Sequence, residues 1–176
     1  MTADVIRCER FDLVLLTPAI LEALLAGDDE TAASALGAAF PQPGWANEAP
    51  YVLRMRLDQL RADPSCAPWL LRAIVAPDRT MIGHAGFHGP PDEDGAVELG
   101  YTVFEAFRRQ GYASEAATCL MRWAEREQGI HRFRLSVGEA NAPSLAMAAK
   151  LGFVRTGEQM DEIDGLEYVF EREGVP

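Results

Sequence analysis

The first third of the chain has the hydrophobic pattern of one short strand followed by helices. Leu21, Leu24 and Leu25 recur at helical spacing after Thr17 and Pro18, a pair typical of a helix start. The predicted elements are, in order, a strand at Phe11–Leu16, a helix from Thr17 that Gly27 ends, a short helix at Asp28–Ala39 that Pro41 to Gly44 breaks, and an amphipathic helix at Tyr51–Ala62.

The middle of the chain changes to the pattern of strands. A turn signal at Pro77 to Arg79 separates two apolar runs, and the run from Gly89 to Gly95, rich in proline, glycine and acidic residues, marks a second turn. These signals predict an antiparallel meander with strands at Trp69–Ala76, Thr80–His88 and Ala96–Phe104.

The last third alternates helices and strands. Apolar residues follow a helical stripe from Ala113 until Gly129 ends it. The predicted elements after that helix are a strand at Phe133–Val137, a helix at Asn141–Leu151 closed by Gly152, and two strands, one from Phe153 and one at Leu166–Arg172, joined by the acidic turn Asp161–Gly165.

The order of these elements predicts the fold class. A strand, a helix and a strand between Ala96 and Val137 require a parallel pairing with a right-handed crossover. We therefore expect an α/β (α+β) fold, a mixed and mostly antiparallel sheet with a central parallel pair and helices on both faces. Residues 1–176 are predicted to form a single domain, which suits a chain of 19.3 kDa.

Charge narrows the classes of partner. The formal net charge is −11, and the longest basic cluster is Arg108 and Arg109, so a nucleic-acid partner is not expected. An acidic surface attracts cationic substrates such as amines, although it also serves solubility alone. Both interpretations stay open.

The three cysteines and the start of the chain bear on the cellular compartment of the protein. Cys8, Cys66 and Cys119 are odd in number and lack a C-x-x-C spacing, which predicts neither a disulfide framework nor a zinc site. The start of the chain does not have a signal-peptide pattern, and no run approaches the roughly 20 apolar residues that span a bilayer. We expect a cytoplasmic protein with reduced thiols and no membrane partner.

Residues 97–117 contain the strongest functional signal. A strand ends there, a short basic loop with Gly111 follows, and a helix begins. Unpaired backbone N–H groups at the positive end of a helix form a natural seat for a pyrophosphate. Neither G-x-x-x-x-G-K-[ST] nor G-x-G-x-x-G is present, so a P-loop and a dinucleotide fold are not indicated. The segment alone is equally consistent with a plain loop before a core helix.

Two motifs resemble the GNAT acetyltransferases. Arg108-x-x-Gly111-x-Ala113 is similar to the family's coenzyme A loop [Gln/Arg]-x-x-Gly-x-[Gly/Ala]. Asn141 to Ser144, followed by Gly152 and Phe153, is similar to the family's next motif. The resemblance covers Trp69 to Arg172 well, and it is greatest to the group that contains ribosomal-protein N-terminal acetyltransferases.

This resemblance implies acetyl-CoA as cosubstrate and a location for it. The amides of Arg109 to Ser114 would bind the pyrophosphate, and the strands ending near Val103 and starting at Phe133 would splay to hold pantetheine as a missing strand. The implied cofactor-binding residues are Val103, Arg108, Arg109, Gln110, Gly111, Tyr112, Ala113, Ser114 and Asn141.

Three residues are candidates for the chemistry of acetyl transfer. Glu98 is a charge in an apolar strand and could take the proton that an amine must lose before it attacks, although a solvent-facing glutamate is nearly as plausible. Strand alternation puts it on the opposite face from Tyr101. A backbone N–H near Tyr101 or Thr102 could stabilise the tetrahedral intermediate. Many relatives have a tyrosine where this chain has Ala148, so Ser144 is the candidate that protonates the thiolate, or an ordinary first-turn serine.

The histidines and an acidic segment near the C-terminus are further candidates for function. His84 and His88 would lie about 13 Å apart along one strand, too far to share an ion, so no metal is expected. The acidic segment from Glu158 to Glu167, which includes Asp161, Glu162 and Asp164, could border the acceptor site and attract a cation, or be a solvated hairpin tip. The predicted acceptor is a primary amine on a small molecule or a peptide. A catalytically silent acyl-CoA-binding module, a structural or partner-binding domain, and a homodimer all stay open.

Overall fold

An eight-stranded mixed sheet forms the centre of the protein in the computed structural model, which describes residues 5–41, 44–48, 50–163 and 165–175. The strands run in the order β1-β2-β3-β4-β5-β6-β8-β7 across it. Their bounds are β1 Val5–Arg7, β2 Asp12–Leu15, β3 Arg72–Val75, β4 Met81–Phe87, β5 Ala96–Val103, β6 Arg132–Gly138, β7 Val154–Asp161 and β8 Gly165–Glu173. All the pairings are antiparallel except the one between β5 and β6, as the sequence predicts.

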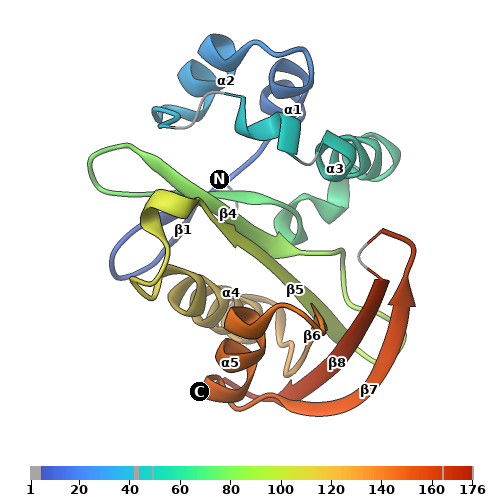
Figure 1. Ribbon diagram of the computed structural model, residues 1–176. Helices are drawn as coiled ribbons and strands as arrows, with labels where there is room; N and C mark the ends of the chain where they lie inside the picture. The colour runs from blue at the N-terminus through green and yellow to red at the C-terminus, as the bar shows by residue number, and fades with distance from the viewer. Residues whose placement is uncertain (1–4, 42–43, 49, 164, 176) are drawn as a thin grey trace.

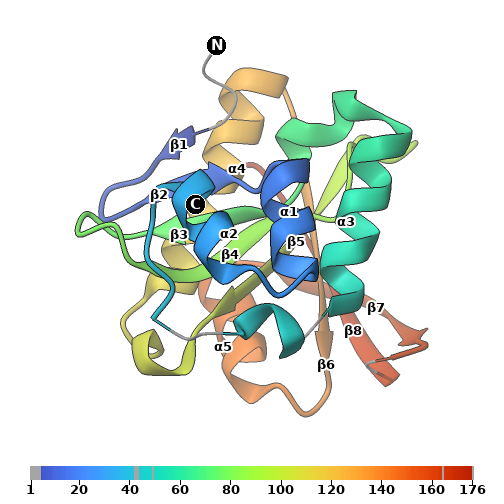
Figure 2. The same cartoon turned by 90° about the horizontal axis from the view of Figure 1, so that it is seen from above.

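Helices cover both faces of this sheet. One group of α-helices lies on one face and a second group on the other, as Figure 1 and the view from above in Figure 2 show. Their bounds are α1 Pro18–Leu25, α2 Asp29–Leu36 and α3 Pro50–Ala62 on the first face, and α4 Tyr112–Gln128 and α5 Ala142–Lys150 on the second. The alternation of strand residues builds two hydrophobic cores: Ile74 packs toward α4, whereas Ala73 and Val75 pack toward the first three helices.

Two elements differ from the expectation. Strand β1 was not predicted, because three residues with only Ile6 buried carry too little pattern to detect. The strand predicted from Trp69 begins only at Arg72. Residues Pro64–Trp69 form a 3-10 helix instead, which Asp63 caps through its contact with the Ser65 N–H. Proline at 64 and 68 favours this local turn over a paired strand.

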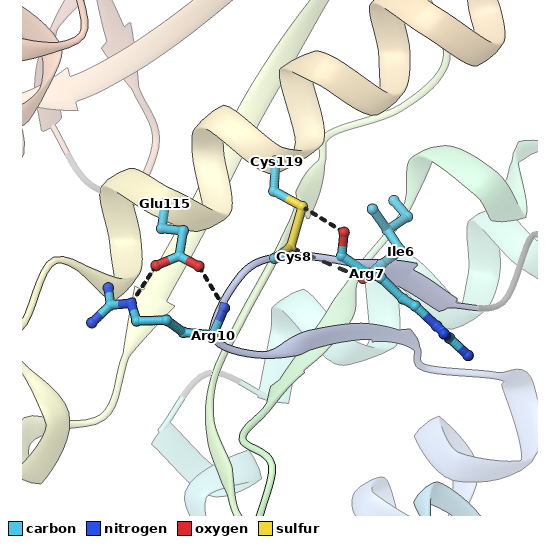
Figure 3. Close-up of a disulfide and its surroundings, with 6 residues drawn as sticks. All are labelled: Ile6, Arg7, Cys8, Arg10, Glu115 and Cys119. Carbon is cyan, nitrogen blue, oxygen red and sulfur yellow. Dashed lines mark hydrogen bonds and ion pairs between the residues drawn. A yellow bond between two sulfur atoms is a disulfide. The ribbon is translucent and has the colours of Figure 1, made fainter.

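The expectation of reduced thiols is wrong for two of the three cysteines. Cys8 and Cys119 form a disulfide that ties the segment after β1 to the middle of α4, across 111 residues of sequence (Figure 3). Cys66 is free and buried. The pairing was missed because the spacing of cysteines in sequence does not show which of them meet in space. The disulfide removes the reduced-thiol argument for a cytoplasmic location, which stays a prediction.

No helix in the described ranges combines the length and apolar character that a membrane span requires.

Candidate active site

The central parallel pair separates shortly after it begins. Strands β5 and β6 pair only from Ala96 to Glu98, opposite Arg132 to Arg134. Beyond Glu98, β5 pairs with β4 on its other side and β6 pairs with β8 as far as Gly138. The facing edges of residues 99–103 and 135–138 therefore have no strand between them. The predicted splay is present, and its apex lies at Glu98.

A cleft of about 1110 Å³ opens from this gap. Its walls come from β4, β5, β6, the beginnings of α3 and α5, and both ends of the β7–β8 turn. Unpaired strand edges inside such a cleft are suited to hydrogen-bond an extended ligand with alternating donors and acceptors, as an added strand would. Pantetheine, with its two amide groups, has that chemistry.

A seat for an anion lies where the loop after β5 meets α4. Gly111 caps the helix with φ +83°, and no side chain caps the helix there. In the described chain, the N–H groups of Arg109, Gln110 and Gly111 donate to no other protein group, and the first-turn N–H groups of a helix lack intrahelical acceptors. The positive φ of Gly111 and of Arg109 (+62°) turns the loop in the way the predicted pyrophosphate seat requires. This geometry fits the linked phosphates of coenzyme A.

Arg10 holds this loop from a distant part of the chain, and sequence reasoning missed it. Its Nε donates to the Glu115 carboxylate at 2.5 Å and its Nη1 to the Gln110 carbonyl at 3.0 Å. Its guanidinium carbon lies 4.5 Å from the centre of the Tyr112 ring. One side chain thus contacts the loop, the helix start and the first turn of α4, two residues after the disulfide at Cys8 (Figure 3).

Gly111 and Ser114 do not line the cleft at the β5–β6 gap but a second groove, of about 860 Å³, which runs along α4 beside the disulfide. Its basic lining residues are Arg7, Arg10, Arg122, Arg126 and Lys150. The Ser114 hydroxyl donates to the Gly111 carbonyl at 2.9 Å. Arg108 bends back to donate its Nε to the Val103 carbonyl at 3.0 Å, which fixes the start of the loop. The side chains of Arg108 and Ser114 thus bond to the protein's own backbone. The backbone N–H groups of the loop remain available to an anion.

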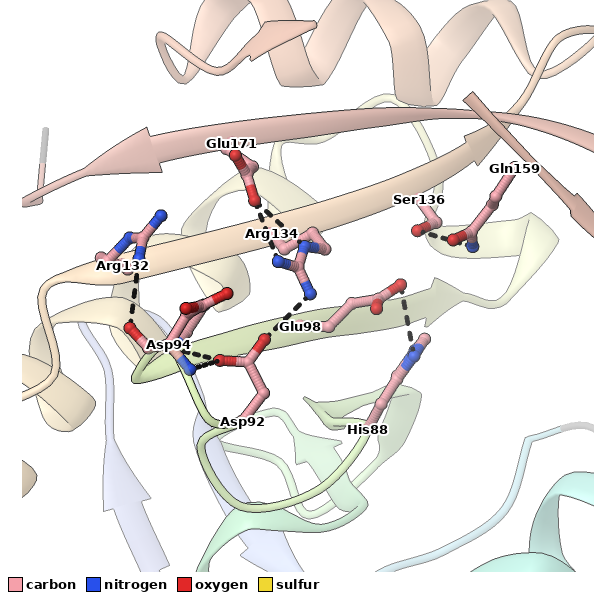
Figure 4. Close-up of polar contacts among 10 residues, drawn as sticks. His88, Asp92, Asp94, Glu98, Arg132, Arg134, Ser136, Gln159 and Glu171 are labelled. Atoms are coloured by element: carbon pink, nitrogen blue, oxygen red, sulfur yellow. Dashed lines mark hydrogen bonds and ion pairs between the residues drawn. The ribbon is translucent and has the colours of Figure 1, made fainter. Parts of the chain in front are cut away.

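Glu98 lies at the apex of the splay beside a histidine. Its Oε1 is 3.5 Å from Nδ1 of His88, whose ring is half-exposed (Figure 4). His88 lines the cleft, whereas Glu98 is not among the described residues that line it. The histidine ring lies over Gly100, where any Cβ would come within 2.7 Å of its Nε2. Sequence reasoning considered His88 only as a metal ligand and missed this pair.

Two contacts fix the backbone of His88. The buried Arg56 on α3 donates to the His88 carbonyl at 2.7 Å, and Gln59 donates to it at 3.2 Å. Burial lowers the pKa of His88, Glu98 opposes that change, and Arg56 adds to it. The lowered pKa favours the neutral imidazole, the form that can accept a proton at the cleft wall.

The cation opposite Glu98 on β6 has carboxylate partners of its own. Arg134, the register partner of Glu98, donates to Glu171 at 3.0 Å and to Asp92 at 3.1 Å (Figure 4). The hydrogen bond to Glu171 raises the pKa of Arg134, as does the one to Asp92. Because two carboxylates hold this guanidinium, it is not the ion-pair partner of Glu98.

The other candidates meet on the α5 side of the gap. Tyr101 and Ser144 both line the cleft. Burial raises the pKa of Tyr101, and the side chain of Ser144 opposes that change. Asn141 caps α5 by accepting from the Ser144 N–H at 3.2 Å. Ala148 is fully buried and has no hydroxyl. The candidates for protonation of the thiolate are therefore the hydroxyls of Tyr101 and Ser144.

The arrangement defines a class of protein. A mixed sheet that splits between two parallel strands, with a helix N-terminus next to the split, is the architecture of acetyl-CoA-dependent acyltransferases. The chain belongs to the GNAT family, since the family description "Acetyltransferase (GNAT) domain" matches residues 10–154.

Individual relatives agree at the level of family and fold. An uncharacterized N-acetyltransferase of Bacillus subtilis (strain 168), YjdG, is 36% identical over 42% of this chain and 44% of its own, and a second, YnaD, is 30% identical over 48% and 49%. The chain thus spans about half the length of these curated relatives. A GNAT acetyltransferase from Bacillus anthracis has a TM-score of 0.65 at 19% identity over 96% of this chain and 98% of its own. RimL, a ribosomal L7/L12 α-N-protein acetyltransferase solved with coenzyme A, has a TM-score of 0.66 at 17% identity over 97% and 98%.

Proposed function

We propose that residues 1–176 act as one N-acetyltransferase domain that transfers an acetyl group from acetyl-CoA to a primary amine. The observation that carries the proposal is the split between β5 and β6, which joins an anion seat to a pair of acid–base groups. The thioester of acetyl-CoA supplies the activated acetyl group. Bound as the missing strand, it would lie between His88 on one face of the gap and Tyr101 on the other.

The base side of the reaction uses His88 and Glu98. A primary amine with a pKa near about 10.4 is mostly protonated at pH 7 and must lose a proton to attack. Neutral His88 is in position to take that proton at the cleft wall, and the Glu98 carboxylate stabilises the imidazolium that forms. In this proposal Glu98 acts through His88, which refines its predicted role as the base.

The acid side uses Tyr101 and Ser144. As the amine nitrogen bonds to the acetyl carbon, a backbone N–H near Tyr101 stabilises the oxyanion. The carbon–sulfur bond then breaks, and a hydroxyl of Tyr101 or Ser144, both of which line the cleft, protonates the thiolate. One protonated amine and one acetyl-CoA give one N-acetyl amide, one coenzyme A thiol and one proton.

Release of free thiol from acetyl-CoA in the presence of an amine panel tests this function. We expect thiol release that depends on the amine, with an acetylated product detected by mass. The buried Ala148, in place of the tyrosine of many relatives, favours a second candidate, a silent acyl-CoA-binding module. Tight acetyl-CoA binding without thiol release for any amine would support that candidate and exclude the transferase.

Glu98→Gln tests the proton route. The variant lacks the charge that raises the pKa of His88, so His88 becomes a weaker base and turnover should fall by roughly 10- to 100-fold. Wild-type turnover should rise with pH as His88 loses its proton, with an inflection below its ordinary value of 6.5, and in the variant this inflection should move to lower pH. An unchanged pH profile with full turnover would assign the base elsewhere.

A further inference from the structure

The cleft has an end that the cosubstrate does not need. One part of it continues from the gap between β5 and β6 and belongs to pantetheine in the proposed function, on which this inference rests. The remaining walls are the first turns of α3 and the two ends of the β7–β8 turn, which approach each other in Figure 1. An amine that reaches the thioester beside His88 must enter between these walls.

Large apolar side chains stand exposed on both walls. Tyr51 and Met55 on α3 are 42% and 43% exposed, and Ile163 in the β7–β8 turn is 64% exposed. All three line the cleft. Three of the six large hydrophobic side chains that are exposed in the described ranges therefore face one opening, whereas soluble proteins usually scatter such residues singly.

Negatively charged side chains outnumber arginines among the residues that line the cleft. The carboxylates that line the cleft are Glu139, Asp161 and Glu167. In the described ranges, the one guanidinium among the lining residues is that of Arg56, which is buried and donates to the His88 carbonyl and Gln59. An entering ligand thus meets negative charge at the rim, which attracts a cation and repels a carboxylate.

We propose that the acceptor is a protonated primary amine attached to an apolar or aromatic body that has no carboxylate. The apolar body lies between α3 and Ile163, and the carboxylates at the rim draw in the ammonium group before His88 deprotonates it. An arylalkylamine and the N-terminus of a peptide with an apolar first residue share this chemistry. The acidic turn predicted from the sequence borders the acceptor site and is more than a solvated tip.

A matched series of acceptors tests the inference at saturating acetyl-CoA, with kcat/KM measured by thiol release. 2-Phenylethylamine should exceed ethanolamine, which lacks the apolar body, by about 10-fold or more. It should exceed phenylalanine, which adds only a carboxylate, by a similar factor. A phenylalanine-initiated peptide amide distinguishes the two sources: activity equal to that of 2-phenylethylamine assigns a peptide N-terminus, and much lower activity assigns a small amine.

A matched pair of variants connects the selectivity to the cleft. Ile163→Ser should lower kcat/KM for 2-phenylethylamine by about 3- to 10-fold and leave ethanolamine unchanged. Val154→Ser is the control, because Val154 is 67% exposed at the start of β7 and does not line the cleft. Equal rates for the three small acceptors, or equal effects of the two variants, would overturn the inference while leaving acetyl transfer intact. An absence of thiol release with every amine would instead reject the proposed function.

Discussion

The cofactor end and the acceptor end of the proposed site are built in opposite ways. At the cofactor end, Arg10 donates to the Gln110 carbonyl of the loop and contacts Glu115 and Tyr112 at the start of α4. The disulfide of Cys8 ties the same distant segment to α4. At the acceptor end, Met55 and Ile163 expose their apolar side chains. The cofactor end is held by covalent and charged contacts, whereas the acceptor end exposes apolar side chains to solvent.

This difference follows from what each end must bind. The pyrophosphate of acetyl-CoA does not vary, so backbone N–H groups in one fixed geometry suffice to bind it, and any movement of the loop weakens all of those contacts together. An acceptor is selected by the side chains it touches, which can change without disturbing the backbone. Substitutions at the two ends should therefore separate cofactor binding from acceptor selection.

Gly111→Trp, at the cofactor end, should have the largest effect on acetyl-CoA binding. The indole would occupy the seat, and a φ of +83° strains any residue with a Cβ. We expect roughly 1,000-fold weaker acetyl-CoA binding, about 4 kcal/mol, by titration calorimetry. Gly129→Trp is the control, because Gly129 ends the same helix at φ +69° with nothing within 4 Å of its Cβ position. Near-native affinity in a folded Gly111→Trp protein would refute the seat.

Removal of the disulfide should have the next largest effect. The Cys8→Ser and Cys119→Ser variants free the segment that carries Arg10 from α4. We expect the free energy of unfolding to fall by about 2–4 kcal/mol in denaturant titrations, since the cross-link restricts the unfolded chain. A dithiol reductant should do the same to the wild type, by converting the disulfide to two thiols as the dithiol becomes a disulfide. Equal stability of wild type and variants would show that the cross-link does not hold this end.

Much of the fold could be predicted because its signals are local. The change from period-2 to period-3.6 patterning predicted the meander, α4 and the parallel crossover, and the loop at Gly111 was predicted from residues next to one another. Strand β1 escaped prediction because an edge strand of three residues has too few positions to show alternation.

The contacts that organise the site could not be predicted, because they join distant residues. Arg10 and Glu115 are 105 positions apart, and Cys8 and Cys119 are 111 apart. Glu98 was selected because a charge in an apolar strand is unusual. Its partner His88 is brought to it by the pairing between β4 and β5, which the sequence predicts only as a meander and not in register.

Arg10→Ala should loosen the phosphate loop without unfolding the protein. It removes the hydrogen bond to the Gln110 carbonyl and the contacts with Glu115 and Tyr112. We expect the KM for acetyl-CoA to rise about 10-fold, about 1.4 kcal/mol, with kcat and the amine KM nearly unchanged. Arg61→Ala is the control, since Arg61 pairs with Glu22 on the surface between α3 and α1. A fall in kcat without a change in KM would place Arg10 outside cofactor binding.

Met55→Ala should have the smallest effect. It should change the KM of the amine and not that of acetyl-CoA, the reverse of Arg10→Ala. Met55 is 43% exposed on the acceptor wall, and a surface substitution of this kind usually changes stability by less than about 0.5 kcal/mol. The KM of an apolar amine should rise about 3-fold from the lost contact area, while the KM of acetyl-CoA stays constant. Thermal unfolding and steady-state kinetics on one preparation measure both. If the cofactor KM moved with the amine KM, the two ends of the proposed site would form one coupled unit, and the separation between a fixed cofactor end and an adaptable acceptor end would be wrong.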